Sequence, residues 1–135
     1  MRLARILALF CALPTSAWAA GQLAQLAAPG ETVTVTLQAD AFHDECMPLT
    51  AGDKLVFEFT ASALVEFHIH YHVGDRAFYP RFPQEARVQA STFRARSDQA
   101  YCMTWTNLQE APVSVTYTYD VAGRDVSDET ETETR

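Results

Sequence analysis

The chain has 135 residues, of which 48% are hydrophobic, and its formal net charge is −7. This length suits a single domain that buries a core of its own. Only ten residues are lysine or arginine, and they are scattered along the sequence. A nucleic-acid groove or an anionic membrane surface requires clustered positive charge, so the composition argues against both as partners.

The N-terminal end has the layout of a secretory signal peptide, which we place at 1–19. Arg2 and Arg5 precede an apolar run over 6–13, and the small-residue pattern Ala-Trp-Ala follows at 17–19. The apolar run is much shorter than the ~20 residues that a membrane-spanning helix needs. We therefore predict export to the periplasm or the extracellular space, with no membrane span in the mature chain. Loss of the two arginines makes its net charge −9 (−7 − 2).

Alternating polar and apolar residues dominate the rest of the chain. Residues 20–31 form a short lead-in that ends in the turn signal Pro29-Gly30, and the period-two pattern then extends from 32 to 121. Its apolar positions are rich in β-branched and aromatic residues, which is typical of strands that are covered on one face. The clearest runs are ETVTVTLQA (31–39), DKLVFEFTA (53–61) and PVSVTYTYDV (112–121).

Turn signals separate these runs and indicate the fold class. No window shows sustained helical periodicity, although 84–89 is short and polar enough for a brief turn. Several short strands at this spacing predict an all-β fold, an antiparallel, jelly-roll-like β-sandwich or small barrel in a single domain over 32–121. The signals rich in glycine, aspartate, asparagine and proline lie at 50–53, 73–75, 97–99 and 107–112.

The last segment, 122–135, is predicted to be an acidic, disordered tail. It ends in SDETETETR, which has no apolar residue. Such a segment cannot bury enough apolar surface to offset the entropy of ordering.

Two cysteines, Cys46 and Cys102, remain once the signal peptide is removed. An even pair in an exported chain predicts a disulfide, which would close a loop of about 55 residues and stabilise the domain by roughly 4 kcal/mol. The alternative is a pair of thiolate ligands. Each cysteine is followed by a methionine, Met47 or Met103, and such soft sulfur donors suit monovalent copper.

Three of the four histidines lie in one predicted strand, LVEFHIHYHV (64–73). With a period of two, one face is apolar and packs on the core, while the other is polar and faces solvent. The polar face carries Glu66, His68, His70 and His72.

The spacing limits how this row can bind a metal ion. Residues two apart on a strand lie about 6.6 Å apart and residues four apart about 13 Å apart. Because metal–imidazole bonds are about 2 Å long and tetrahedral ligands are not collinear, one ion can take two neighbouring histidines but hardly all three. A donor from another strand would complete the site, with copper or zinc as the ion. The candidate donors elsewhere are His43, Asp44, Glu45, Met47 and Met103, and Glu66 of the same strand is a further possible donor.

Two other interpretations of the histidine row remain open. It can be a plain solvent-exposed face, or a cluster that titrates near pH ~6.5 and senses pH. The chain shows no nucleophile elbow, phosphate loop or dinucleotide motif, so we predict a non-enzymatic protein. The enzymatic alternative is a metal-dependent hydrolase in which Glu66 acts as general base.

The order ECMPLTAGDKLVFEFTASALVEFHIHYHVGD, followed later by STFRARSDQAYCMTWTN, resembles the GOLD domain. The shared features are an early Glu-Cys before an alternating strand, a Gly-Asp turn after it, and a late Tyr-Cys strand that closes on an asparagine. The resemblance covers roughly Thr32 to Val121. It implies a compact β-sandwich with a disulfide between the positions of Cys46 and Cys102.

GOLD domains are best known from the lumenal part of cargo receptors in the early secretory pathway. The coiled coil and membrane span of those receptors are not found in this chain, and the three-histidine strand departs from their pattern. We therefore expect a stand-alone, exported binding module for an unknown protein or small ligand, with the histidine row as its functional surface. The alternative is a periplasmic copper- or zinc-binding protein that uses two of the three strand histidines.

Overall fold

The computed structural model describes residues 27–123, which form six strands and no helix. All strand pairings are antiparallel, so the predicted all-β class is confirmed. The predicted signal peptide, most of the lead-in and nearly all of the tail lie outside the described residues. The described residues contain no helix that is long and apolar enough to cross a membrane. The strands are β1 (Val33–Leu37), β2 (Phe42–Leu49), β3 (Lys54–Val73), β4 (Arg76–Arg94), β5 (Gln99–Thr106) and β6 (Val113–Ala122).

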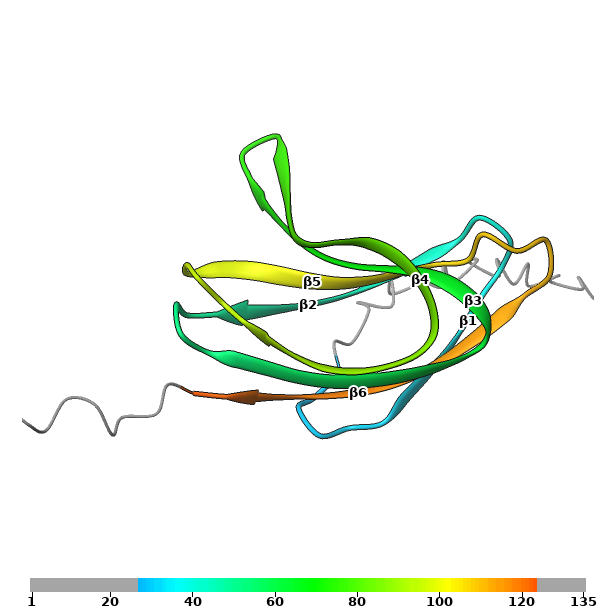
Figure 1. Ribbon diagram of the computed structural model, residues 1–135, viewed down its shortest axis with the longest axis horizontal. Helices are drawn as coiled ribbons and strands as arrows, with labels where there is room; N and C mark the ends of the chain where they lie inside the picture. The colour runs from blue at the N-terminus through cyan, green and yellow to red at the C-terminus, as the bar shows by residue number, and fades with distance from the viewer. Residues whose placement is uncertain (1–26, 124–135) are drawn as a thin grey trace, which may run out of the picture.

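The long strand β3 organises one curled sheet, whose order is β1-β6-β3-β5-β2 with β4 also on β3 (Figure 1). One edge of β3 pairs with β4 along most of its length. The other edge pairs with β6 over 54–61 and then with β5 over 66–70. The sheet therefore has two halves, which meet where β3 changes its partner.

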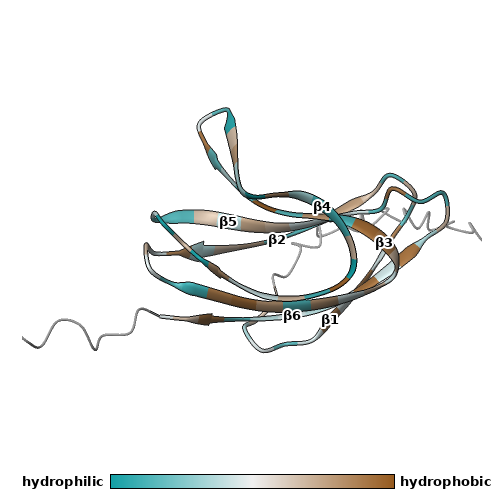
Figure 2. Cartoon of the chain, in the orientation of Figure 1, coloured by the Kyte–Doolittle hydropathy of each residue, from teal (hydrophilic) through white to brown (hydrophobic). Residues whose placement is uncertain are grey.

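Contacts between aromatic rings show that these two halves face each other. The ring centroids of Phe57 and Phe67 lie 5.3 Å apart, although ten residues of straight strand would span about 33 Å. Trp105 of β5 stacks on Tyr117 of β6 at 4.5 Å. Figure 2 shows hydrophobic residues along the bend of β3. The enclosed side chains form a continuous core, which gives the fold most of its stability.

Two details of the chain differ from the sequence-based prediction. The runs at 53–61 and 64–73 belong to one strand, with a shift of register between Thr60 and Val65. The brief turn predicted over 84–89 is wrong, because β4 continues through it and Gln84 pairs with Phe67. Long-range pairing with β3 decides the conformation there, since the local sequence is polar and has no strong preference.

The predicted disulfide is present between Cys46 and Cys102, with an S–S distance of 2.01 Å. The two cysteines are directly opposite each other on the paired strands β2 and β5, and their Cα atoms are 4.0 Å apart. The thiolate-ligand alternative is therefore wrong, because both sulfur atoms are bonded to each other.

We predict that replacing both cysteines with serine lowers the free energy of unfolding by about 4 kcal/mol, because the bond closes a loop of 56 residues. Urea denaturation of the oxidised protein and of the double variant measures this difference. Mass analysis without reductant should also find the protein two hydrogen atoms lighter than its reduced form. Equal denaturation midpoints with and without reductant would contradict the prediction.

Candidate functional site

The outer surface of the second half of β3 carries the three histidines in a row. His68 and His70 are half-buried, and His72 is exposed. Neighbouring rings are in contact, with centroid separations of 5.2 Å between His68 and His70 and 5.0 Å between His70 and His72. We call this surface the histidine face. It consists of Glu66, His68, His70 and His72 of β3, Asp44 of β2 and Thr104 of β5.

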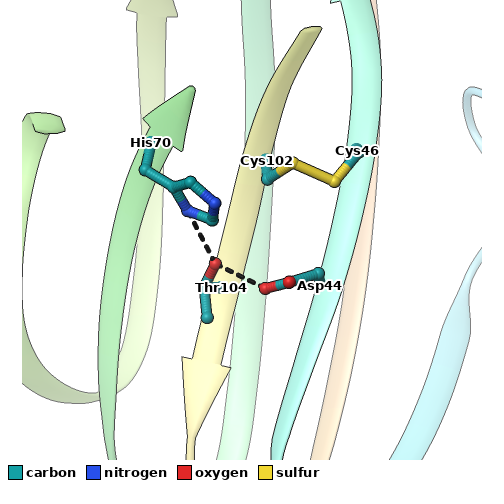
Figure 3. Close-up of a disulfide and its surroundings, with 5 residues drawn as sticks. All are labelled: Asp44, Cys46, His70, Cys102 and Thr104. Atoms are coloured by element: carbon teal, nitrogen blue, oxygen red, sulfur yellow. Dashed lines mark hydrogen bonds between the residues drawn. A yellow bond between two sulfur atoms is a disulfide. The ribbon is translucent and has the colours of Figure 1, made fainter. Parts of the chain in front are cut away.

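The hydroxyl group of Thr104 on β5 connects His70 of β3 to the carboxylate of Asp44 on β2 (Figure 3). Thr104 Oγ1 donates its only proton to Asp44 Oδ1 at 2.7 Å. The same oxygen lies 3.1 Å from His70 Nδ1, so it must accept a hydrogen bond from that nitrogen. The proton of neutral His70 is therefore on Nδ1, and the Nε2 atom keeps a lone pair that can bind a ligand.

His68 has a different environment. Its Nδ1 atom is buried and has no hydrogen-bond partner among the described residues. A proton on that nitrogen would be an unsatisfied buried donor, at a cost of about 1–3 kcal/mol. The neutral ring therefore carries its proton on Nε2. Tyr79 of β4 packs its ring edge-on against His68 at 5.2 Å and covers one side of it.

Burial keeps both half-buried rings neutral. Desolvation lowers the pKa of His68 from its ordinary value of 6.5, against the opposing effects of Glu66 and then Asp44. Desolvation also lowers the pKa of His70, and the neighbouring histidines add to this effect while Asp44 opposes it. At pH 7 both rings are uncharged, which is the form that binds a metal ion.

The structure brings only some of the predicted donors to this face. Asp44 reaches it, and Glu66 lies at its end, opposite Thr106 of β5. The other donors lie on the inner surface, because side chains alternate along β2 and β5. They are His43, Glu45, Met47 and Met103, and all but His43 are buried. Among the described residues, no group of three histidine, cysteine or acidic side chains is arranged to hold an ion.

His43 and Glu45 instead belong to a polar cluster inside the fold. Tyr117 Oη donates to Glu45 Oε2 at 2.6 Å and accepts from His43 Nε2 at 2.9 Å. The backbone N–H of Ala27 also donates to the Glu45 carboxylate. Burial, followed by the hydrogen bond to Glu45, raises the pKa of Tyr117. This carboxylate is therefore committed to the core and is not available to the histidine face.

Thr104 is the site residue that the sequence analysis did not identify. One signal could have found it. If Cys46 and Cys102 are assumed to face each other on antiparallel strands, the residues two positions away, Asp44 and Thr104, must also face each other. Both then lie on the same surface as the disulfide.

Comparisons with known proteins add little to this description. No family model and no curated protein matches the chain. A solved structure that resembles it is the solution NMR structure of a de novo designed double-stranded beta-helix. The identity is 14%, the TM-score is 0.39, and the match covers 67% of this chain and 99% of that chain. A similarity at this level carries no argument about function.

We predict that His68 and His70 of the metal-free protein titrate below pH 6.5. Because their folded-state pKa values are lowered, their contribution to stability is complete above the unfolded-state value and is lost as the pH falls through the folded-state values. NMR titration of the ring protons measures both midpoints. The unfolding temperature should also fall more between pH 7 and pH 5 than in a His68→Gln, His70→Gln variant. Midpoints at or above 6.5 would contradict this prediction.

Proposed function

We propose that the protein is an exported, non-enzymatic binding module whose functional surface is the histidine face. The observation that carries this proposal is the chain of hydrogen bonds from Asp44 through Thr104 to His70. An imidazole on a strand surface normally rotates freely, whereas this ring is oriented by two other side chains and presents Nε2 to a ligand. Such outer hydrogen bonds are characteristic of histidines that bind metal ions.

A divalent copper or zinc ion is the ligand that this geometry supports best. His70 and His72 form the better of the two neighbouring pairs. His70 already has its lone pair on Nε2. His72 is exposed, so solvent can satisfy either of its tautomers. Binding through Nε2 of His68 would instead move a proton onto its buried, unpartnered Nδ1.

Two imidazoles leave at least two positions of a tetrahedral ion for water or for a ligand atom from a partner. The protein would then hold copper or zinc for exchange with another molecule more readily than as a permanent structural ion. A protein or small ligand that binds the histidine face without a metal is the alternative. The two are distinguished by metal titration.

The position of Glu66 argues against metal-dependent hydrolysis. It lies four residues from His70, a separation of about 13 Å along a strand, and further still from His72. A general base must come within about 3 Å of the water that it activates, directly or through one further water. Glu66 is therefore poorly placed to act on a water bound at the His70–His72 pair.

The similarity to GOLD domains remains a hypothesis based on the short sequence motifs around Cys46 and Cys102. A β-sandwich of that type is compatible with two sheet halves that face each other. Binding of a protein or small ligand would be the function expected from that relationship.

We predict that the protein binds one Cu²⁺ or Zn²⁺ ion, and that His70→Ala or His72→Ala weakens this binding at least tenfold. His68→Ala should change the affinity less than threefold, because this ring is not a ligand in the proposed site. Isothermal titration calorimetry of the purified, metal-free protein measures all four affinities. If less than one ion binds per protein, and if His70→Ala and His72→Ala do not change that amount, the metal site is excluded. The histidine face would then bind a protein or small ligand without a metal.

Thr104 provides a separate test of the orienting hydrogen bonds. Thr104→Val keeps the shape of the side chain but removes the hydroxyl group, and we expect about tenfold weaker metal binding. Thr104→Ser keeps the hydroxyl and should restore the affinity. Thr106→Val, two residues further along the same strand, is the matched control. Equal losses in the valine variants would show that the effect is a general one on β5.

A further inference from the structure

A pocket of about 440 Å³ lies at the end of β3, where its lining residue Tyr71 stands between His70 and His72 in the sequence but on the opposite face of the strand. Its walls come from the end of β3, both halves of β4, the connection after β4 and the start of β5. Strand β4 is strongly curved (Figure 1), and a hydrogen bond of 3.1 Å from Arg81 Nη2 to Ser91 Oγ connects its first and second halves. Most of the lining therefore belongs to paired strands, and Arg96 and Ser97 belong to the connection after β4.

Three aromatic rings form the apolar part of this pocket. Tyr71 packs edge-on against Tyr101 at 5.2 Å, and Phe93 lies at the same distance from Tyr101. The Tyr101 hydroxyl donates to the backbone oxygen of Ser97, which holds the ring in place. Tyr101 is 1% and Phe93 9% exposed, so these two rings form the floor of the pocket, and the half-buried Tyr71 carries more of the ring surface that a bound apolar group can contact.

Two arginines give the rim a positive charge in a protein whose net charge is −7. Arg94 donates to the backbone oxygen of Gly52 through Nη1 and keeps further N–H groups for a ligand. Arg96 is exposed beside it. The nearby carboxylates of Asp53 and Asp98 accept hydrogen bonds from backbone N–H groups of the 50–53 turn. Neither of these aspartates lines the pocket.

We propose that this pocket binds a small molecule that has an apolar body and a carboxylate group. The half-buried ring of Tyr71 and the exposed Pro80 would contact its apolar body. The guanidinium groups of Arg94 and Arg96 would bind its carboxylate, since the arginine fork matches the two oxygen atoms of that group. This site is independent of the histidine face and does not require a metal ion.

Benzoate is a suitable probe, with benzamide as the uncharged analogue and acetate as the carboxylate without a ring. Titration of the ¹⁵N-labelled protein, followed by two-dimensional NMR, should give saturable shifts confined to residues that line the pocket. Benzamide and acetate should each bind at least tenfold more weakly than benzoate. Equal binding of benzoate and benzamide, or benzoate shifts that neither saturate nor cluster at the pocket, would overturn the proposal.

Arg96→Gln should weaken benzoate binding about tenfold. The residue is exposed, so the fold is expected to persist, and the spectrum of the variant shows this directly. Arg76→Gln removes the same charge at the far end of β4, outside the pocket, and should leave the affinity unchanged. If both variants lose the same benzoate affinity, the loss reflects the net charge of the protein, and the proposed site is refuted.

Discussion

The pairing of β3 is the constraint on which the rest of this structure depends. One edge of the strand follows β4, while the other changes from β6 to β5 where the sheet folds over. Because side chains alternate along a strand, this path directs Phe57 and Phe67 towards each other inside the fold. The same alternation places His68 and His70 outside. The core and the histidine face are therefore two consequences of one strand path.

The consecutive acidic residues Asp44 and Glu45 show how alternation separates two similar sets of hydrogen bonds. In each set a hydroxyl group lies between a carboxylate and an imidazole. On the outer surface, Thr104 connects Asp44 to His70. Inside, Tyr117 connects Glu45 to a histidine that is packed against the core. In the inner set, the Glu45 carboxylate also accepts a hydrogen bond from the N–H of Ala27, and these bonds stabilise the fold. In the outer set, the hydrogen bond at Nδ1 of His70 leaves its Nε2 atom for a ligand.

The disulfide contributes to the geometry of the outer surface as well as to stability. Cys46 and Cys102 face each other next to the pair formed by Asp44 and Thr104. A covalent bond at this point keeps β2 and β5 in register, and the hydrogen bonds to His70 depend on that register. His70 itself is aligned with Cys102 across β3 and β5 (Figure 3). The site thus rests on paired strands, which position side chains more accurately than loops do.

The sequence by itself determined the all-β class and placed the three histidines on one face of a strand, because period-two alternation is a local property of the chain. It also predicted the disulfide from the number of cysteines, with thiolate ligands as the alternative. It did not determine which donors share that surface. Met47 and Met103 face the core, and Thr104 was not identified, since the relative faces of β2, β3 and β5 depend on long-range register. The aromatic pocket also required the tertiary structure. Its walls come from segments as far apart in the sequence as Tyr71 and Tyr101, which the long-range pairing of β3 with β5 brings together.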